Sequence, residues 1–483
     1  MIGREKETLL LNEALENNES EFIAIYGRRR VGKTYLVDEV YGNNIVFRHT
    51  GLQPLSQNRS DSEKENALKR QLNAFYDSLK AFGLVASNEN KPSYWLDAFS
   101  LLAQGLKKFK NQRVVVFIDE LPWMDTPKSY FLEAFSHFWN NYCFPSKNIV
   151  LVICGSASSW ILNNIIHGLG GLYNRTTRQI RLSPFTLLEC EKYLISRGIE
   201  YSRYDIAQAY MSVGGVPFYL RYFKRGLSLA QNIDQLFFGR DAILKDEFDE
   251  LFSSQFTHPE KYRKIVEMLG EKNSGFTPNE IAEKIGISNN GDFYKMLKAL
   301  DAGTFISSYS CFKEAKNEIK YRLIDPFCLF YLKHIKENKD VSQYWQSNID
   351  NQKVVSWKGI AFENLCFNHI DKIKNKIGIP WMATNETFLT AKGKEDQQGA
   401  QIDLIIERKD NIVNLCEAKF YSNEYTINKT DHLNLENKKE HIKSMIGKRQ
   451  SVQKVLLTTY GLKHNEYFYD YEIVITLDDL FID

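Results

Sequence analysis

The sequence predicts a multi-domain α/β protein. Its 483 residues are enough for two to four domains, at the usual ~100–200 residues per domain. Short runs rich in valine and isoleucine alternate with amphipathic helical stretches over residues 1–185, a pattern typical of a parallel sheet with crossover helices. A glycine-rich loop follows the first of these runs. Together these observations predict an N-terminal nucleotide-binding core with further domains behind it.

Changes in the sequence pattern divide the chain into four stretches. Residues 1–185 are expected to form the α/β core, and residues 186–255 to form a helical domain. Residues 256–335 show compact helices and then a pair of strands. Residues 336–483 show a helix, a strand hairpin, a charged helix and a final apolar strand, with the polar segment Lys336–Asp340 as the expected linker. The strands expected in the core are Glu21–Tyr26, Asn43–Arg48, Arg113–Ile118 and Ile149–Cys154.

Composition excludes several classes of protein. Hydrophobic residues make up 43% and charged residues 25%, which argues against a disordered, collagen-like or coiled-coil chain. The net charge is only +2, so a nucleic-acid surface would have to be a local patch. The seven cysteines are scattered without a CxxC pair, which favours a reducing cytosol over a disulfide framework. No apolar run is long enough to cross a membrane, so we expect a cytoplasmic protein.

A phosphate-binding loop is the strongest motif in the chain. The segment from Gly27 to Thr34 has the form GxxxxGK[ST], and it lies between an apolar strand and a helix. Backbone N–H groups of such a loop point at phosphate oxygens, and the helix N-terminus adds partial positive charge. Lys33 would neutralise the β- and γ-phosphates of ATP, and Thr34 would contribute its hydroxyl to Mg²⁺. The residues expected to contact the nucleotide are Gly27, Arg28, Arg29, Arg30, Val31, Gly32, Lys33, Thr34 and Tyr35.

Acidic and polar residues follow two later strands. Asp119 and Glu120 end the apolar strand Val114–Ile118, where Asp119 would hold Mg²⁺ with Thr34 and Glu120 would polarise the attacking water. Ser156 follows the next strand and would sense the γ-phosphate, although it could instead cap a helix. Arg175, with Arg178 as a second choice, is the candidate arginine finger, while ordinary surface arginines remain the alternative.

Five motifs in order carry a family resemblance. They are Ile2–Glu5, Tyr26–Thr34, Phe117–Glu120, Ile153–Ser156 and Gly214–Pro217. In these motifs the chain resembles prokaryotic AAA+/STAND-like P-loop ATPases of the archaeal type. The resemblance implies that Ile2–Arg4 lies near the adenine and that the helical residues after 185 form a lid. It also implies a C-terminal domain of poorly defined function.

The middle stretch predicts a winged helix-turn-helix. Thr277–Glu280 is a capping box, its helix ends at Gly286, and a second helix is expected over 291–300. Two segments, 305–312 and 320–324, would then pair as a wing. Basic residues on the second helix and the wing favour DNA contact, whereas their acidic neighbours allow a purely structural role. The basic residues in question are Lys295, Lys298, Lys313, Lys316, Lys320 and Arg322.

The C-terminal stretch contains two carboxylates and a lysine in a strand hairpin. Asp403 lies on the first strand, and Glu417 and Lys419 lie two residues apart on the second, so both project from one face. The two carboxylates would hold Mg²⁺ or Mn²⁺, and Lys419 would stabilise charge developing on a phosphate. An upstream helix would add Glu363 as a ligand. The lysines of a charged helix over 436–450 would either track a phosphate backbone or face solvent.

This order of residues resembles the PD-(D/E)xK restriction-endonuclease-like nucleases. The resemblance covers Glu363, Asp403, Glu417 and Lys419, and it departs from the family pattern at Ile402, where the motif's proline would stand. It implies a catalytic Lys419 and a metal held by the three carboxylates.

Taken together, the motifs predict an ATPase that binds DNA through the winged helix and cleaves it in the C-terminal domain. The main alternative is a nucleotide-dependent regulatory or signalling switch that binds DNA or a protein and cuts nothing. A protein-remodelling ATPase is a third possibility. Assembly of several copies of the chain is compatible with all three.

Overall fold

The computed structural model describes residues 1–53, 61–86, 88–168, 170–256, 258–313, 319–391 and 399–482. The chain folds as two compact units: Met1–Pro184 with Glu250–Pro259, and Phe185–Asp249 with Glu260–Asp483. Within the described residues, no helix is both long and apolar enough to span a bilayer. All seven cysteines are free thiols.

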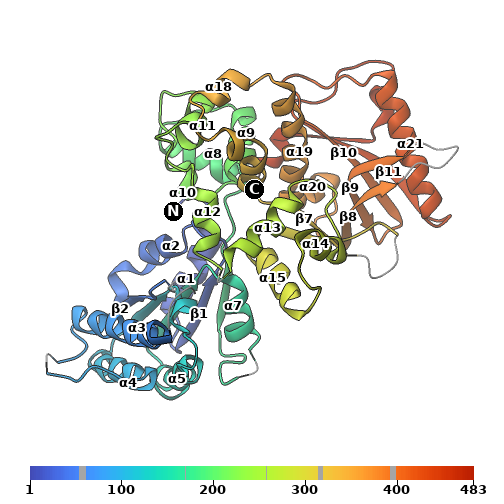
Figure 1. Ribbon diagram of the computed structural model, residues 1–483. Helices are drawn as coiled ribbons and strands as arrows, with labels where there is room; N and C mark the ends of the chain where they lie inside the picture. The colour runs from blue at the N-terminus through green and yellow to red at the C-terminus, as the bar shows by residue number, and fades with distance from the viewer. Residues whose placement is uncertain are drawn as a thin grey trace. The chain divides into compact units, whose positions relative to one another are not determined.

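The first unit is built on a five-stranded parallel sheet, which confirms the predicted parallel architecture (Figure 1). Its strand order is β2-β3-β4-β1-β5. The strands are β1 Glu21–Tyr26, β2 Ile45–Thr50, β3 Val114–Asp119, β4 Ile149–Gly155 and β5 Arg178–Arg181. Strand β2 begins two residues later than expected, and β5 was not predicted at all because its sequence Arg-Gln-Ile-Arg lacks an apolar run.

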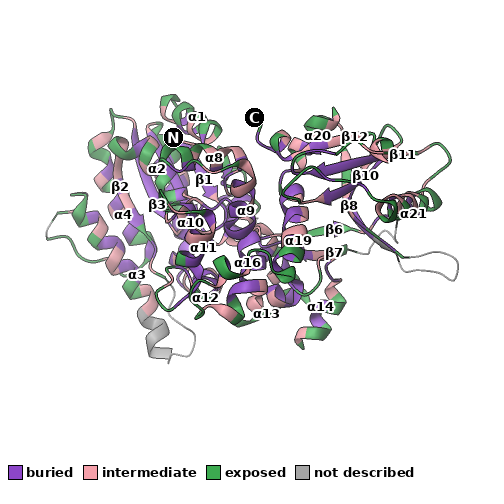
Figure 2. Cartoon of the chain, turned by 90° about the horizontal axis from the view of Figure 1, so that it is seen from above, coloured by how far each residue is buried: buried purple, intermediate pink, exposed green. Residues whose placement is uncertain are grey.

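Helices cover both faces of this sheet, so its strands are apolar on both sides. Alternate residues of β1 enter different cores: Phe22 and Ala24 pack on one face, and Ile23 and Ile25 on the other. The helical elements are α1 Glu5–Glu16, α2 Lys33–Tyr41, η1 Gly42–Asn44, α3 Asp61–Ala81, α4 Trp95–Leu106, η2 Lys107–Phe109, η3 Leu121–Met124, α5 Phe131–Phe138, η4 Trp139–Cys143, α6 Phe144–Ser146, α7 Ser158–Ile161 and η5 Leu162–Ile166. Figure 2 shows how completely β1 and β3 are buried.

The second unit begins with a run of helices; helices are predicted over residues 186–255, and the run continues past that segment to Leu269. These are α8 Leu187–Ser196, α9 Arg203–Val213, α10 Pro217–Leu220, α11 Leu229–Phe237, α12 Glu247–Ser253, which crosses between the units, and α13 Pro259–Leu269. Helix α9 ends at Gly214, whose φ of +70° terminates the helix, and Pro217 starts α10. A Cβ at Gly215 would lie 2.2 Å from the carbonyl oxygen of Phe185, so only glycine fits there.

A helix pair and a hairpin follow in the predicted order. Helix α14, Pro278–Ile285, is preceded by the Thr277–Glu280 capping box and ends at Gly286. Helix α15 spans Gly291–Ala302, and β6 Ile306–Ser310 pairs antiparallel with β7 Ile319–Leu323. The assignment of these elements to a winged helix stays a prediction. Lys316 lies outside the described residues.

The expected linker at Lys336–Asp340 is not a break in the structure. Helix α16 Pro326–Phe330, the π-helical turn η6 Tyr331–Ile335 and α17 Lys336–Asn338 run on without interruption. The polar segment continues this helical run as far as Asn338, directly after the buried Ile335, and Lys339 and Asp340 form the turn that follows.

The remaining residues form a mixed five-stranded sheet in the order β12-β11-β10-β9-β8. Strands β8, β9 and β10 pair antiparallel, and β10, β11 and β12 pair parallel. The strands are β8 Thr384–Ala391, β9 Ala400–Arg408, β10 Ile412–Lys419, β11 Ser451–Thr458 and β12 Ile473–Thr476. The helical elements are α18 Tyr344–Asn348, α19 Gln352–Asn368, α20 Ile370–Ile377, α21 Lys429–Met445, η7 Phe468–Asp470 and η8 Leu477–Leu480.

Helix α21 begins earlier than the predicted charged helix over 436–450. Asn428 caps it and forms a capping box with Asp431, which starts the helix seven residues before the expected point. Leu435 and Ile442 of this helix pack into the core above β10, together with Val413 and Leu415. One face of α21 therefore lies on the sheet.

The aromatic core of the first unit gives a direct test of its packing. Phe99 is buried and lies within 5.1–6.0 Å, centroid to centroid, of five other aromatic rings. Phe99→Ala should lower the free energy of unfolding by about 3–5 kcal/mol, because it leaves a cavity among rings that cannot collapse into it. Phe144→Ala is the matched control, since that ring is 54% exposed, and it should cost about 1 kcal/mol or less. Equal losses in chemical denaturation would contradict this packing.

Candidate functional sites

The phosphate loop contains two glycines in backbone conformations that other residues rarely adopt. It joins β1 to α2, and Gly27 and Gly32 adopt φ values of +146° and +94°. A Cβ at Gly27 would lie 2.2 Å from the carbonyl oxygen of Leu182. Arg30 also adopts a positive φ, of 72°. The loop thus turns tightly at the carboxyl end of β1, as a phosphate cradle requires.

Lys33 lies inside this loop. It is 6% exposed, and its ammonium donates hydrogen bonds of 3.0 Å to the carbonyl oxygens of Gly27 and Arg28. Burial lowers the pKa of Lys33, and the nearby carboxylates of Glu120 and Asp119 oppose that shift. A buried ammonium at the helix N-terminus is a strong attractor for phosphate oxygens.

Thr34 and Asp119 meet where Mg²⁺ is expected. The Thr34 hydroxyl donates to Asp119 Oδ2 at 2.6 Å, and the Glu120 backbone N–H donates to Asp119 Oδ1 at 2.9 Å. Strands β1 and β3 are separated only by β4, so both strand ends reach the same edge of the sheet. A hydroxyl beside a carboxylate is a donor set that suits Mg²⁺.

Glu120 and Ser156 contact each other directly. Ser156 donates from both its backbone N–H and its hydroxyl to Glu120 Oε2, at 3.1 and 3.0 Å. Glu120 itself has a φ of +46°, an unusual conformation for a non-glycine residue. The two residues were predicted separately, as a water-activating carboxylate and a phosphate sensor, and the hydrogen bonds between them were not foreseen.

Other residues predicted near the nucleotide are placed as follows. Arg28 and Val31 are buried, Arg29 is half-buried, and Tyr35 is 59% exposed. Arg30 pairs with Glu250 at 3.3 Å. Arg4 donates to the carbonyl oxygen of Val31 at 3.2 Å, which brings the Ile2–Arg4 segment to the loop. Its proximity to adenine stays a prediction.

The structure does not bring Arg175 or Arg178 to the phosphate loop of their own chain. Arg178 begins β5 and is aligned with Ile23, near the start of β1, while the loop follows the end of β1. It pairs there with Glu13 at 3.0 Å and Glu21 at 3.6 Å. Arg175 is exposed and precedes β5, so it lies toward the amino edge of the sheet, opposite the loop. The crossover from β4 to β5 is responsible, because it returns the chain to that edge before β5 begins.

In the second unit, the β9–β10 hairpin brings Asp403 and Glu417 together. The last antiparallel pair is Leu404 with Cys416, so Asp403 and Glu417 lie one step beyond it, where the two strands separate. Asp403 Oδ2 accepts a 3.1 Å hydrogen bond from the backbone N–H of Ala418. Lys419 Nζ lies 3.9 Å from Glu417 Oε2.

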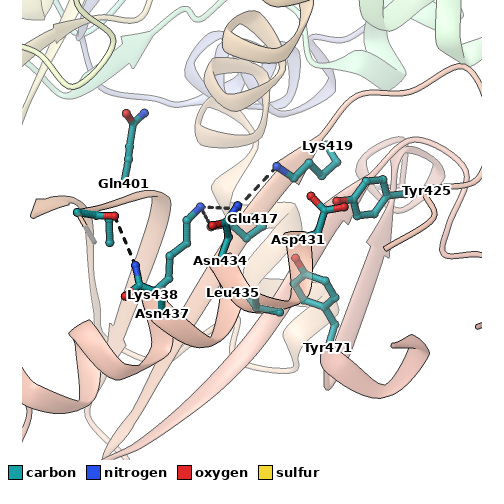
Figure 3. Close-up of a pocket in the computed structure, with 12 residues that line it drawn as sticks. Gln401, Glu417, Lys419, Tyr425, Asp431, Asn434, Leu435, Asn437, Lys438 and Tyr471 are labelled. Atoms are coloured by element: carbon teal, nitrogen blue, oxygen red, sulfur yellow. Dashed lines mark hydrogen bonds and ion pairs between the residues drawn. The ribbon is translucent and has the colours of Figure 1, made fainter. Parts of the chain in front are cut away.

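Lys438 is the strongest partner of Glu417. It extends from α21 and donates to both carboxylate oxygens, at 2.6 and 2.7 Å. Glu417 is only 4% exposed, so this carboxylate depends on nearby cations for its charge balance. Figure 3 shows Lys419 and Lys438 converging on Glu417 from two different elements. Lys438 was expected only as one of several basic residues on the helix.

Glu363 extends from α19 and is held by a buried polar network. Asn273, which precedes α14, donates to Glu363 Oε2. Arg322, on β7, donates to the side-chain oxygens of Asn273 and Asn364. Arg322 is 1% exposed, and its guanidinium lies 4.2 Å from the centroid of the Phe388 ring. Arg322 was expected to be a basic residue on the wing surface, and the structure corrects this: its side chain lies inside the unit.

Among the other basic residues of the helix pair and hairpin, one forms a local pair, one pairs with strand β9 and one is exposed. Lys295 pairs with Asp292 at 2.9 Å, and Lys313 pairs with Glu407. Lys298 is exposed. These contacts leave both readings of this segment open, a DNA surface and a structural module.

Glu363 and Glu417 of the C-terminal site both have raised pKa values. Burial raises the pKa of Glu363, and the neighbouring Asp403 raises it further. Burial and Asp403 also raise the pKa of Glu417, which Lys438 and Lys419 oppose. Burial lowers the pKa of Lys419, but Glu417 and Asp403 outweigh it, so the net pKa is raised. Carboxylates held so close to one another suit a divalent cation, which would neutralise them together.

Their present arrangement is not a complete coordination shell. Across the described part of the chain, no three or more His, Cys, Asp or Glu side chains are grouped closely enough to hold a metal ion. Glu363 is turned to Asn273 and Glu417 to Lys438. Asp403, Glu417 and Glu363 would therefore need to reorient their side chains to share a cation.

A cavity of about 260 Å³ opens beside Glu417 and Lys419, between the sheet and α21 (Figure 3). Besides these two residues, its lining includes Gln401, Asn434, Asn437 and Lys438, which are neutral or cationic. Asp431, Tyr425 and Tyr471 close its other side.

The geometry of the first unit defines a P-loop nucleotide-hydrolase domain, and comparison with known proteins agrees. Residues 1–223 match a family described as an ATPase domain predominantly from Archaea. An uncharacterized protein of Methanocaldococcus jannaschii is 25% identical over 413 residues, which cover 84% of this chain and 83% of that protein. Residues 1–223 are therefore similar to archaeal-type ATPase domains.

Among solved structures, two archaeal proteins illustrate the likeness. The Walker-type ATPase of Pyrococcus abyssi has 16% identity and a TM-score of 0.46, covering 69% of this chain and 96% of its own. The ORC2 protein of Aeropyrum pernix has 13% identity and a TM-score of 0.38, covering 69% and 94%.

The raised carboxyl pKa values predict the pH dependence of stability. Because Glu363 and Glu417 bind protons more tightly when folded, the folded chain carries more protons than the unfolded one above the ordinary carboxyl pKa. The free energy of unfolding contributed by this site should fall as pH rises from about 5 toward neutral in metal-chelating buffer. The measurement is urea denaturation at several pH values, with Glu363→Gln/Glu417→Gln as the control. An identical pH profile for the double variant would contradict the prediction.

Proposed function

We propose that this protein is an ATPase that binds DNA and cleaves it with a divalent cation in its C-terminal domain. The similarity of residues 1–223 to an ATPase domain predominantly from Archaea supports the first part of this proposal. The observation that carries the rest is the meeting of Asp403, Glu417 and Lys419 at the end of the β9–β10 hairpin. This set joins a buried and a half-buried carboxylate to a lysine, with Glu417 and Lys419 beside an open cavity, and such groups can support hydrolysis of a phosphodiester.

In the ATP site, each predicted residue has a distinct task. Lys33 would neutralise the β- and γ-phosphates, and Thr34 and Asp119 would hold Mg²⁺. Bound Mg²⁺ supplies charge neutralisation on the transferred phosphoryl group. Glu120 would orient and polarise the attacking water, with Ser156 holding its carboxylate in place. Arg175, at the opposite edge of the sheet, would act only on a neighbouring copy of the chain.

Substitutions in this site should separate binding from hydrolysis. Glu120→Gln should keep ATP binding but slow hydrolysis by roughly 100-fold or more, because the amide cannot act as a base. Ser156→Ala should slow hydrolysis by roughly tenfold through loss of one hydrogen bond to Glu120. Steady-state phosphate release and nucleotide affinity are the two measurements. If Glu120→Gln abolished ATP binding and left residual turnover unchanged, the assigned role would be wrong.

In the C-terminal site, Asp403 and Glu417 would hold Mg²⁺ or Mn²⁺, with Glu363 as a third ligand. The cation would supply Lewis-acid activation of the phosphate. Lys419 lies close enough to Glu417 to stay protonated, so it would stabilise negative charge on the phosphate as a water attacks.

Cleavage of plasmid and single-stranded DNA, with Mg²⁺ or Mn²⁺ and with or without ATP, tests this assignment. Lys419→Ala should reduce cleavage by roughly 100-fold or more. Lys409→Ala is the matched control, because Lys409 is exposed at the other end of the same hairpin. We expect this variant to cleave DNA as the wild type does. Cleavage that survives in Lys419→Ala would come from another site or a contaminant.

The same experiment decides the alternative function. A regulatory switch that binds DNA or a protein without cutting is favoured by one observation, the occupation of both Glu417 oxygens by Lys438. Intact ATP binding without cleavage under any condition would support that function. DNA contact by the helix pair and hairpin of residues 256–335, through Lys298 and its neighbours, belongs to both proposals.

A further inference from the structure

The cavity beside Glu417 differs chemically from a cation site. Its lining contains two ammonium groups, Lys419 and Lys438, and three side-chain amides, Gln401, Asn434 and Asn437. Amides and ammonium groups are the donors that bind oxyanions. Its acidic members, Glu417 and Asp431, are both engaged: Glu417 with Lys438, and Asp431 with the backbone at the start of α21 and with Tyr425.

Lys438 has a different environment from the other lysines of α21. Lys439 pairs with Glu436 at 2.9 Å and Lys443 with Glu440 at 2.9 Å, both along the helix surface. Only 17% of the Lys438 side chain is exposed, and it points to the sheet and the cavity instead. The residues Asp431, Asn434 and Lys438 recur at intervals of three and four, so they line one face of the helix.

Lys438 and a divalent cation would need the same two oxygen atoms. Lys438 donates to both Oε1 and Oε2 of Glu417, which leaves that carboxylate without a free oxygen in the direction of the cavity. A cation that Glu417 chelates with both oxygens would compete with the ammonium for those atoms and, carrying the greater charge, would displace it. The displaced ammonium would remain in the cavity, next to the amides.

We propose that this cavity binds a backbone phosphate of a nucleic acid, and that Lys438 transfers from Glu417 to that phosphate when a divalent cation binds. The inference rests on the proposed function and adds to it a substrate-binding residue and the place of the phosphodiester. The phosphate then replaces Glu417 as the anionic partner of Lys438. The cation frees the Lys438 ammonium, and the phosphate gives that ammonium a new partner. Binding of either ligand therefore favours binding of the other.

A purely structural Lys438 predicts the opposite behaviour. If its ammonium only compensated Glu417, its removal would leave an unpaired buried carboxylate, lower stability and leave DNA affinity alone. The proposal instead predicts that removal frees Glu417 for the cation and weakens the hold on phosphate.

The test compares Lys438→Met and Lys438→Gln with Lys439→Met in the full-length chain. Binding of Mn²⁺ alone is measured by electron paramagnetic resonance, and binding of a short DNA is measured in Ca²⁺ across a range of salt concentrations. Both Lys438 variants should bind Mn²⁺ roughly tenfold more tightly and DNA roughly tenfold more weakly. The slope of log affinity against log salt should fall by about one. Lys439→Met should match the wild type in both assays.

Several outcomes would overturn the inference. Weaker Mn²⁺ binding in both folded Lys438 variants would contradict competition between Lys438 and the cation, and unchanged DNA affinity would remove the phosphate site and leave Lys438 a structural role. The glutamine variant keeps a polar side chain, so it serves if the methionine variant does not fold. Failure of the wild type to bind Mn²⁺ would instead overturn the proposed nuclease function. Binding of both ligands by the wild type, with no change in the variants, would overturn the role of Lys438 alone.

Discussion

Burial of charge at the ends of strands is the constraint on which both candidate sites depend. Lys33, in the loop that follows β1, and Glu417, near the end of β10, are almost completely removed from water. Each is tolerable only because the protein supplies a partner: two carbonyl oxygens for Lys33, and the Lys438 ammonium for Glu417. Those partners lie where phosphate oxygens or a cation would give stronger compensation. When such a buried charge binds its ligand, it exchanges a protein partner for the ligand. Because the fold has already removed the charge from water, ligand binding causes little further desolvation of that charge.

The arrangement also explains why residues far apart in the sequence gather around Glu363. A carboxylate buried near Asp403 is repelled by it, and the network of Asn273, Arg322 and Asn364 offsets that repulsion. Arg322 comes from the β6–β7 hairpin and Glu363 from α19, so the middle segment of the chain contributes directly to the environment of the C-terminal carboxylates. A boundary at residue 335 would separate Arg322 from Glu363, and the continuous helical run through Asn338 crosses that boundary.

Local sequence patterns predicted most of what lies close together along the chain. Three features depend on only a few consecutive residues and could therefore be predicted from the sequence: the phosphate loop, the capping box at Thr277 and the β9–β10 hairpin. The hairpin alone was enough to bring Asp403 near Glu417. Strand β5 was missed because an edge strand of four residues has little apolar pattern to detect. The early start of α21 was missed because its cap, Asn428, was not recognised.

What depended on tertiary contacts could not be predicted. Nothing near Lys438 in the sequence distinguishes it from Lys439, although Lys438 binds Glu417 of the candidate site and Lys439 binds Glu436 of its own helix. Arg322 was assigned to a surface because alternation along a strand does not say which face is covered. The position of Arg175 was in principle deducible, since a crossover between parallel strands returns the chain to the amino edge of the sheet. That argument places it away from its own phosphate loop.

The proposed function places an ATPase and a DNA-cleaving site in one chain, and thermodynamic linkage tests most directly whether the two sites work together. The affinity for a short DNA should be measured with and without a non-hydrolysable ATP analogue, and the affinity for the analogue with and without DNA, in Ca²⁺ and with Lys419→Ala to prevent cleavage. The account predicts that each ligand changes the affinity for the other, and by the same factor, of roughly 5-fold or more. Two affinities that do not respond to each other would contradict it, and would leave an ATPase and a C-terminal domain that work independently.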